Sequence, residues 1–135
     1  MRNSEHLANV MVQAFIDAVN EGIDLVPVVA DSTSTAKIAP FIKQFPDRLV
    51  NVGIAEQSMV GAAAGLALGG KVAVTCNAAP FLIARANEQI KVDVCYNFNQ
   101  RKIVWSECRG RVMDRWRARI MRLMTLRLCV VSAIF

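Results

Sequence analysis

The sequence predicts an α/β domain in which helices flank a parallel sheet, incomplete at its C-terminal end. Short apolar runs rich in valine occur at 25–30, 48–52 and 71–76, and a polar or glycine-containing turn follows each run. Segments with helical periodicity separate these runs, and strands that alternate with helices are typical of a parallel sheet. A hydrophobic content of 54% excludes a disordered chain, and 135 residues suffice for one domain with a buried core.

The chain begins with an expected helix, capped by Asn3 or Ser4 and ended by Glu21-Gly22, where a glycine is typical of a helix C-terminus. The predicted apolar face of this helix recurs every three or four residues and consists of Leu7, Val10, Met11, Ala14, Phe15 and Ala18. The run 25–30 then reads as a buried strand. Pro27 lacks a backbone donor, so we expect this strand near the sheet edge.

The middle of the chain continues the alternation. A helix carrying Ile38, Phe41 and Ile42 is expected to stop near Phe45-Pro46, and 48–52 forms the second strand. A helix of small residues runs from Glu56 to Gly69-Gly70. The third strand is 71–76, a helix from Pro80 through Ile90 follows it, and 102–105 is the fourth strand.

Polar residues follow three of these strands directly, at Asp31-Ser32, at Gly53 to Glu56 and at Thr75 to Phe81. Ligands of open parallel sheets lie beyond the carboxyl ends of the strands, so these segments are the candidate site. Glu56 stands at a helix start, where free N–H groups and the helix dipole favour any carboxylate. Capping is therefore the alternative to a catalytic role for Glu56.

The charge distribution divides the chain near residue 100. Residues 1–100 hold seven Lys/Arg and nine Asp/Glu, whereas 101–135 hold nine Lys/Arg, two Asp/Glu and both tryptophans. We therefore expect a domain over 1–104 and a basic tail over 105–135. The four cysteines form no C-x-x-C pair and His6 is the only histidine, so no metal site is expected. The polar N-terminus lacks the apolar core of a signal peptide, which indicates a cytoplasmic protein.

Residues 24–100 resemble the pyrimidine-binding domain of transketolases, especially the separate C-terminal section of split transketolases. The matching motifs, in chain order, are Phe45-Pro46-Asp47-Arg48, Asn51-Val52-Gly53-Ile54-Ala55-Glu56-Gln57, Met59-Val60-Gly61, Ala64-Gly65-Leu66-Ala67 and Arg85-Ala86-x-Glu88-Gln89-Ile90. The Gly-Ile-Ala-Glu core is shared with deoxyxylulose-phosphate synthase and 2-oxoacid dehydrogenase β chains. The segments Met59-Val60-Gly61 and Asp93-Val94-Cys95-Tyr96-Asn97 favour transketolase.

The resemblance implies thiamine diphosphate as cofactor and two-carbon ketol transfer between sugar phosphates, as in the pentose phosphate pathway. In the family, the glutamate matching Glu56 hydrogen-bonds N1′ of the aminopyrimidine, which lets the 4′-nitrogen take a proton from thiazolium C2. We expect burial to raise the pKa of Glu56.

Three further residues match cofactor-site positions. Phe81 matches the aromatic residue that packs on the pyrimidine, with a core phenylalanine as the alternative. Asp31 and Ser32 match the polar turn near the cofactor or substrate, with a helix N-cap or Asx turn as the alternative. Arg85 is either a phosphate contact or the partner of Glu88 in a helix-surface ion pair. The family usually has another aromatic at the position of Ala78.

The chain contains no Gly-Asp-Gly motif, which in the family marks the domain that binds the diphosphate and magnesium. We therefore expect this chain to supply only the pyrimidine half of a shared site and magnesium to lie on a partner domain. Alone, the chain should be inactive. The expected partners are an N-terminal transketolase section or a homologous subunit, with sugar phosphates as substrates.

The tail from Trp105 no longer resembles the family. Codons exist for Arg119 to Thr125 that, read out of register by one nucleotide, encode His-His-Ala-Leu-Asp-Asp, which is typical of transketolases. We therefore expect a frameshift near Val104 and a truncated, decayed product. One alternative is a working half-subunit completed by a partner. The other is a basic tail that binds nucleic acid or an anionic membrane, which the scattered arginines do not favour because they share no helical face.

Overall fold

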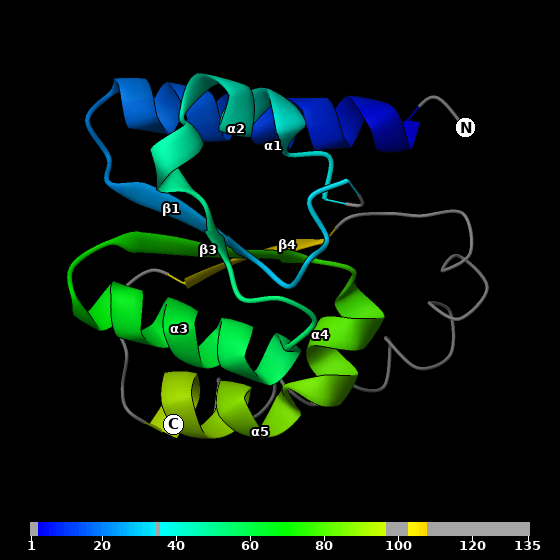
Figure 1. The fold of residues 1–135 in the computed structure, drawn as a ribbon, viewed down its shortest axis with the longest axis vertical. Coiled ribbons are helices and arrows are strands. Elements are labelled where there is room, and N and C mark those ends of the chain that lie inside the picture. The colour runs from blue at the N-terminus through cyan, green and yellow to red at the C-terminus, as the bar shows by residue number, and fades with distance from the viewer. Residues whose placement is uncertain (1–2, 35, 97–102, 108–135) are drawn as a thin grey trace.

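The fold is an open parallel sheet between two layers of helices (Figure 1). The computed structural model describes residues 3–34, 36–96 and 103–107. The sheet has the strand order β2-β1-β3-β4, and every neighbouring pair is parallel. Its strands are β1 (Leu25–Val29), β2 (Val50–Asn51), β3 (Val72–Asn77) and β4 (Ile103–Glu107). The predicted fold class is confirmed.

The helices divide between the two faces of the sheet (Figure 1). One face carries α1 (Asn3–Asn20) and α2 (Ala39–Gln44), followed by the 3₁₀ turn η1 (Pro46–Arg48). The other face carries α3 (Glu56–Leu68), α4 (Ala79–Arg85), α5 (Asn87–Gln89) and the π-helical segment η2 (Ile90–Tyr96). Each face has its own apolar core, one built around Phe15, Ile38 and Phe41 and the other around Met59, Val60 and Leu82.

Helix α1 packs through a face slightly different from the predicted one. Phe15 is buried as expected, but Val12 and Ile16 are also buried, whereas Val10 and Ala14 are exposed. The helix is apolar over much of its circumference, so spacing alone left two stripes possible. The predicted glycine stop is confirmed, because Gly22 adopts a left-handed φ of 88°.

The position of β1 corrects the prediction drawn from Pro27. This strand lies between β2 and β3, in the interior of the sheet. Pro27 is tolerated there because β2 is only two residues long and pairs with Val28 and Val29 alone. The β2 side of Pro27 therefore has no ladder for a proline to interrupt.

The single helix predicted from Pro80 to Ile90 is interrupted. Helix α4 ends at Arg85, and Ala86 has φ −113° and ψ 20°, outside the helical region. A new turn starts at Asn87 and continues into η2. This break makes Arg85 the last residue of α4, which matters for the site.

Strand β4 confirms the expected fourth strand and runs across the predicted domain boundary at 104/105. The remainder of the predicted basic tail lies outside the described residues. In the described part of the chain, no helix combines the length and apolar character needed to span a membrane.

An ionic cluster joins the amino ends of the sheet. Asp24, directly before β1, accepts hydrogen bonds from Arg48 Nη1 at 2.8 Å and from Lys71 Nζ at 2.7 Å. These two bonds, together with the nearby positive charges, hold the pKa of Asp24 below its usual value. All three side chains are exposed to solvent, so we attribute little stability to the cluster.

Candidate functional site

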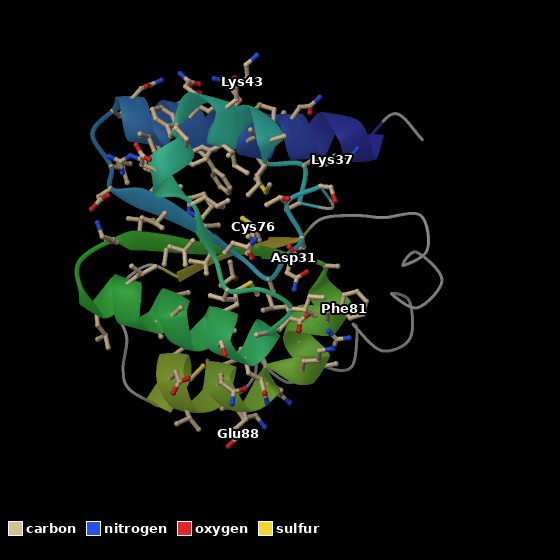
Figure 2. The ribbon with its side chains drawn as sticks, in the orientation of Figure 1. Asp31, Lys37, Lys43, Cys76, Phe81 and Glu88 are labelled. Carbon is tan, nitrogen blue, oxygen red and sulfur yellow. The ribbon has the colours of Figure 1, made fainter. Side chains whose placement is uncertain are left out.

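The candidate site lies where the direction of the strand order changes. From β1 the chain goes to β2 on one side, then crosses to β3 on the other side, so the carboxyl ends of β1 and β3 form a topological switch point. Ser32 joins these two ends, since its Oγ donates a 3.1 Å hydrogen bond to the carbonyl oxygen of Cys76. Figure 2 shows Asp31, Cys76 and Phe81 toward the same end of the sheet.

Asn51, the last residue of β2, organises the two loops at this end. Its side-chain Oδ1 accepts hydrogen bonds from the backbone N–H of Asp31 at 3.1 Å and of Gly53 at 3.0 Å. Both donors adopt left-handed backbone conformations, with φ of 54° for Asp31 and 73° for Gly53. The left-handed conformation is unfavourable for Asp31 but not for glycine. The Asn51 amide oxygen therefore stabilises a strained turn at Asp31 and an unstrained turn at Gly53. The Asn51 side chain was not among the residues predicted from sequence to form the site.

The loop after β1, which contains Asp31 and Ser32, does not lead directly into a helix. The next helix, α2, begins only at Ala39 and has Ile38 at its N-cap, so neither Asp31 nor Ser32 caps a helix. The Ser32 carbonyl accepts from Ala36 N–H at 2.7 Å, which closes a local turn. Asp31 is exposed at the edge of the site.

Glu56 is the first residue of α3 and is 5% exposed. Three contacts hold its carboxylate: Arg85 Nη1 donates to Oε1 at 2.9 Å and to Oε2 at 3.0 Å, and Asn77 Nδ2 donates to Oε1 at 3.3 Å. Asn77 is itself fixed, because its Oδ1 accepts from the backbone N–H of Ala78 at 2.8 Å. The two donor residues lie on other elements, Asn77 at the end of β3 and Arg85 at the end of α4. The contacts of Glu56 therefore go beyond those of a residue that only caps its own helix.

The pKa of Glu56 corrects the sequence-based expectation. Burial by itself raises the pKa, as expected, because it disfavours the charged form. Hydrogen bonds from Arg85, from the backbone and from Asn77, together with the Arg85 charge, outweigh this effect and lower the pKa below its usual value. The expectation was wrong because it did not include a cation beside the carboxylate.

Arg85 connects Glu56 to Phe81. Its guanidinium carbon lies 4.6 Å from the centroid of the Phe81 ring, which is the geometry of a cation–π contact. Phe81 is 39% exposed, so the core alternative for this residue is wrong. Among the described residues, the ion-pair partner of Arg85 is Glu56, and the predicted pair with Glu88 is not formed.

Arg85 thus contacts two of the predicted site residues, Glu56 and Phe81, and Asn77 joins this group through its bond to Glu56. Asp31 and Ser32 belong to the neighbouring loop and are held by Asn51 and Cys76 instead. A buried carboxylate and a partly exposed phenyl ring that contact the same guanidinium suit a flat heterocycle with a ring nitrogen. Among the described residues, no group of three or more His, Cys, Asp or Glu side chains is arranged to hold a metal ion.

Comparison with known proteins identifies related chains. The family model described as "Transketolase, pyrimidine binding domain" matches residues 6–109. One subunit of the apulose-4-phosphate transketolase of Actinobacillus succinogenes is 86% identical over 97 residues, which cover 72% of this chain and 31% of that protein. A putative transketolase C-terminal section of Methanocaldococcus jannaschii is 42% identical over 81 residues, 60% of this chain and 26% of that protein.

A solved structure agrees with these sequence relatives. A split gene transketolase, described as an inactive beta4 tetramer, matches with a TM-score of 0.61 and 33% sequence identity. The match covers 71% of this chain and 31% of that chain. The chain therefore spans about a third of the length of these relatives, and the resemblance inferred from the motifs is confirmed.

Proposed function

This chain belongs to the transketolase pyrimidine-binding domain family, and on that premise we propose that it holds the aminopyrimidine of thiamine diphosphate in a split transketolase. The observation that carries the proposal is the Glu56 carboxylate, buried at the carboxyl end of the sheet and linked through Arg85 to the Phe81 ring. The burial of the Glu56 carboxylate and the partly exposed ring of Phe81 support this role.

Each residue has a definite task in this proposal. Glu56 holds a proton at the pyrimidine ring nitrogen, and Asn77 orients the carboxylate through its 3.3 Å contact. Phe81 offers an apolar surface for the ring. Bound thiamine diphosphate supplies the carbanion chemistry that carries a two-carbon unit. The chain contributes orientation, exclusion of water and one proton site.

We propose that the diphosphate and magnesium are held by a separate N-terminal section. The Gly-Asp-Gly motif is absent from this sequence, and the described residues offer no cluster of metal-binding side chains. The 86% identical relative is named as one subunit of its transketolase, which supports a second, different subunit for this chain as well. The related split-gene structure is described as inactive, which supports our proposal that this chain has no activity alone.

The substrates follow from the same relative. We propose ketol transfer between sugar phosphates, with apulose 4-phosphate as the first donor to test. The reaction would take place in the cytoplasm.

Reconstitution tests the proposal. The chain is co-expressed with an N-terminal transketolase section carrying the Gly-Asp-Gly motif, and ketol transfer from apulose 4-phosphate is assayed with added thiamine diphosphate and magnesium. We expect activity from the pair only, and loss of activity with Glu56→Gln. Glu88→Gln is the matched control, because Glu88 is an exposed carboxylate on α5. Activity that survives Glu56→Gln would contradict the assignment, and a pair inactive with the unaltered chain would favour a decayed product.

We further propose that the residues after about 104 are out-of-frame sequence. The proposal is supported by the family match, which covers residues 6–109 only, and by the existence of codons for Arg119 to Thr125 whose shifted reading gives a transketolase-like run. Sequencing the gene across this region tests the proposal. A shifted frame without a transketolase-like continuation would refute it.

A further inference from the structure

We propose that Arg85 is a latch that closes the pyrimidine site in the free chain and that a bound pyrimidine must displace. The inference rests on the proposed function, because it concerns the two side chains assigned to the pyrimidine. The guanidinium of Arg85 contacts both of them at once, Glu56 through hydrogen bonds and Phe81 through its ring.

On the carboxylate side, the latch occupies the atoms that a ring nitrogen would use. Arg85 Nη1 lies 2.9 Å and 3.0 Å from the two oxygens of Glu56, and Asn77 takes a further position on Oε1. A carboxylate offers about four lone-pair positions, and burial restricts the directions from which a ligand can reach them. The Glu56 side chain is only 6% exposed and that of Arg85 is 51% exposed, so solvent reaches the guanidinium but hardly the carboxylate that it contacts.

On the ring side, the same guanidinium covers one face of Phe81. Its central carbon lies 4.6 Å from the ring centroid, which is also the separation at which a second flat ring would stack. A pyrimidine cannot stack on this face and bond to Glu56 while Arg85 keeps both contacts. Binding through these two residues therefore requires the guanidinium to move.

The position of Arg85 lets the guanidinium move at a small cost in free energy. The residue ends α4, and the backbone leaves the helical region at Ala86. With half of its side chain already in solvent, the guanidinium regains hydration when it swings outward. Glu56 stays behind at the start of α3 and exchanges its cation for the ligand.

Titration with thiamine tests the latch, because thiamine carries the aminopyrimidine without the diphosphate that the partner section would hold. The 135-residue chain is compared with three variants by NMR titration: Arg85→Met, Arg48→Met and Glu56→Gln. Arg48→Met is the matched control, since Arg48 also pairs with a carboxylate, Asp24, but at the opposite end of the sheet. In parallel, the pKa of Glu56 is measured by NMR without ligand.

We expect Arg85→Met to bind thiamine about tenfold more tightly than the unaltered chain, because the ligand no longer competes with the guanidinium; this corresponds to about 1.4 kcal/mol. Arg48→Met should bind like the unaltered chain. Without ligand, Arg85→Met should raise the pKa of Glu56.

The outcomes separate the latch from the proposed function. Equal or weaker binding by Arg85→Met, with binding that still depends on Glu56, would overturn the latch alone and make Arg85 a ligand contact. An unchanged pKa of Glu56 in Arg85→Met would also overturn the latch. Binding that is absent, or that Glu56→Gln leaves unchanged, would contradict the proposed function and the latch with it.

Discussion

Removal of Arg85 should destabilise the fold more than removal of the Glu56 charge, although the two residues form one ion pair. In Glu56→Gln the released guanidinium, already half exposed, turns to water at little cost. The variant loses charge-assisted hydrogen bonds, and we expect a loss of about 1–2 kcal/mol in the free energy of unfolding. In Arg85→Met the carboxylate stays buried without its cation, and a buried charge without a partner destabilises the fold more than an exposed one.

Proton uptake by Glu56 limits the loss of stability in Arg85→Met. A buried carboxylate can take up a proton instead of remaining charged, and this costs about 1.36 kcal/mol for each pH unit between its usual pKa and the assay pH. From the ordinary value of 4.5 to an assay at pH 7, this proton uptake costs about 3.4 kcal/mol, and the stabilisation that lowers the pKa of Glu56 in the unaltered chain is lost in addition. We therefore expect Arg85→Met to lose about 2–3 kcal/mol at pH 7.

Urea unfolding monitored by circular dichroism measures both losses, with Arg48→Met as the control for an exposed pair. The cost of proton uptake falls below about 1 kcal/mol at pH 5, so the Arg85→Met loss should decrease as the pH is lowered. A larger loss for Glu56→Gln than for Arg85→Met would refute the reasoning, as would an Arg85→Met loss that does not fall with pH.

Further predictions concern the pH dependence, the loops and the core. Because the pKa of Glu56 is lowered in the folded state, the Glu56 carboxylate contributes its full stabilisation of the fold above about pH 4.5, and this contribution is lost as the pH falls through the folded-state pKa. Acid unfolding of Glu56→Gln should lack this pH-dependent contribution. Asn51→Ala should lose about 1–2 kcal/mol in urea unfolding, since two backbone donors lose their acceptor, and Asn51→Asp should restore most of it. Gly53→Ala should lose about 1–2 kcal/mol through its left-handed φ alone, because no atom lies within 4 Å of the added carbon. Phe41→Ala should lose about 3–5 kcal/mol, since the ring is fully buried, and an unchanged urea midpoint would contradict any of these three losses.

The fold class could be predicted from sequence because parallel strands are buried on both faces and therefore read as continuous apolar runs. The runs at 25–30 and 71–76 correspond to β1 and β3, and Gly22 ends α1 as expected. The position of β1 within the sheet could not be predicted, because it depends on how far β2 extends beside Pro27. That length is a property of strand pairing and not of the Pro27 segment itself.

For the site, too, features set by neighbouring residues in the sequence could be predicted, whereas features set by tertiary contacts could not. The place of Glu56 beyond a strand follows from the order of apolar run, glycine and carboxylate. Its charge state does not, because it depends on Arg85, which is 29 residues away in the sequence. Helical spacing suggested Glu88 as the partner of Arg85, but the break at Ala86 ends α4 before a regular turn could bring the two together.

Asn51 illustrates a signal that local reasoning could have found. An asparagine directly after a strand and two residues before a glycine is well placed to bond to the backbone of the turn. Its second bond, to Asp31 of the preceding loop, follows only from the pairing of β1 with β2.

We propose that the Glu56 carboxylate and the Phe81 ring receive the pyrimidine of the cofactor. Thiamine titrated into the ¹⁵N-labelled chain tests it most directly. We expect amide shifts concentrated at Glu56, Asn77, Phe81 and Arg85, with none at the Asp24 cluster and none in Glu56→Gln. Shifts at the opposite end of the sheet, or shifts that persist unchanged in Glu56→Gln, would contradict it.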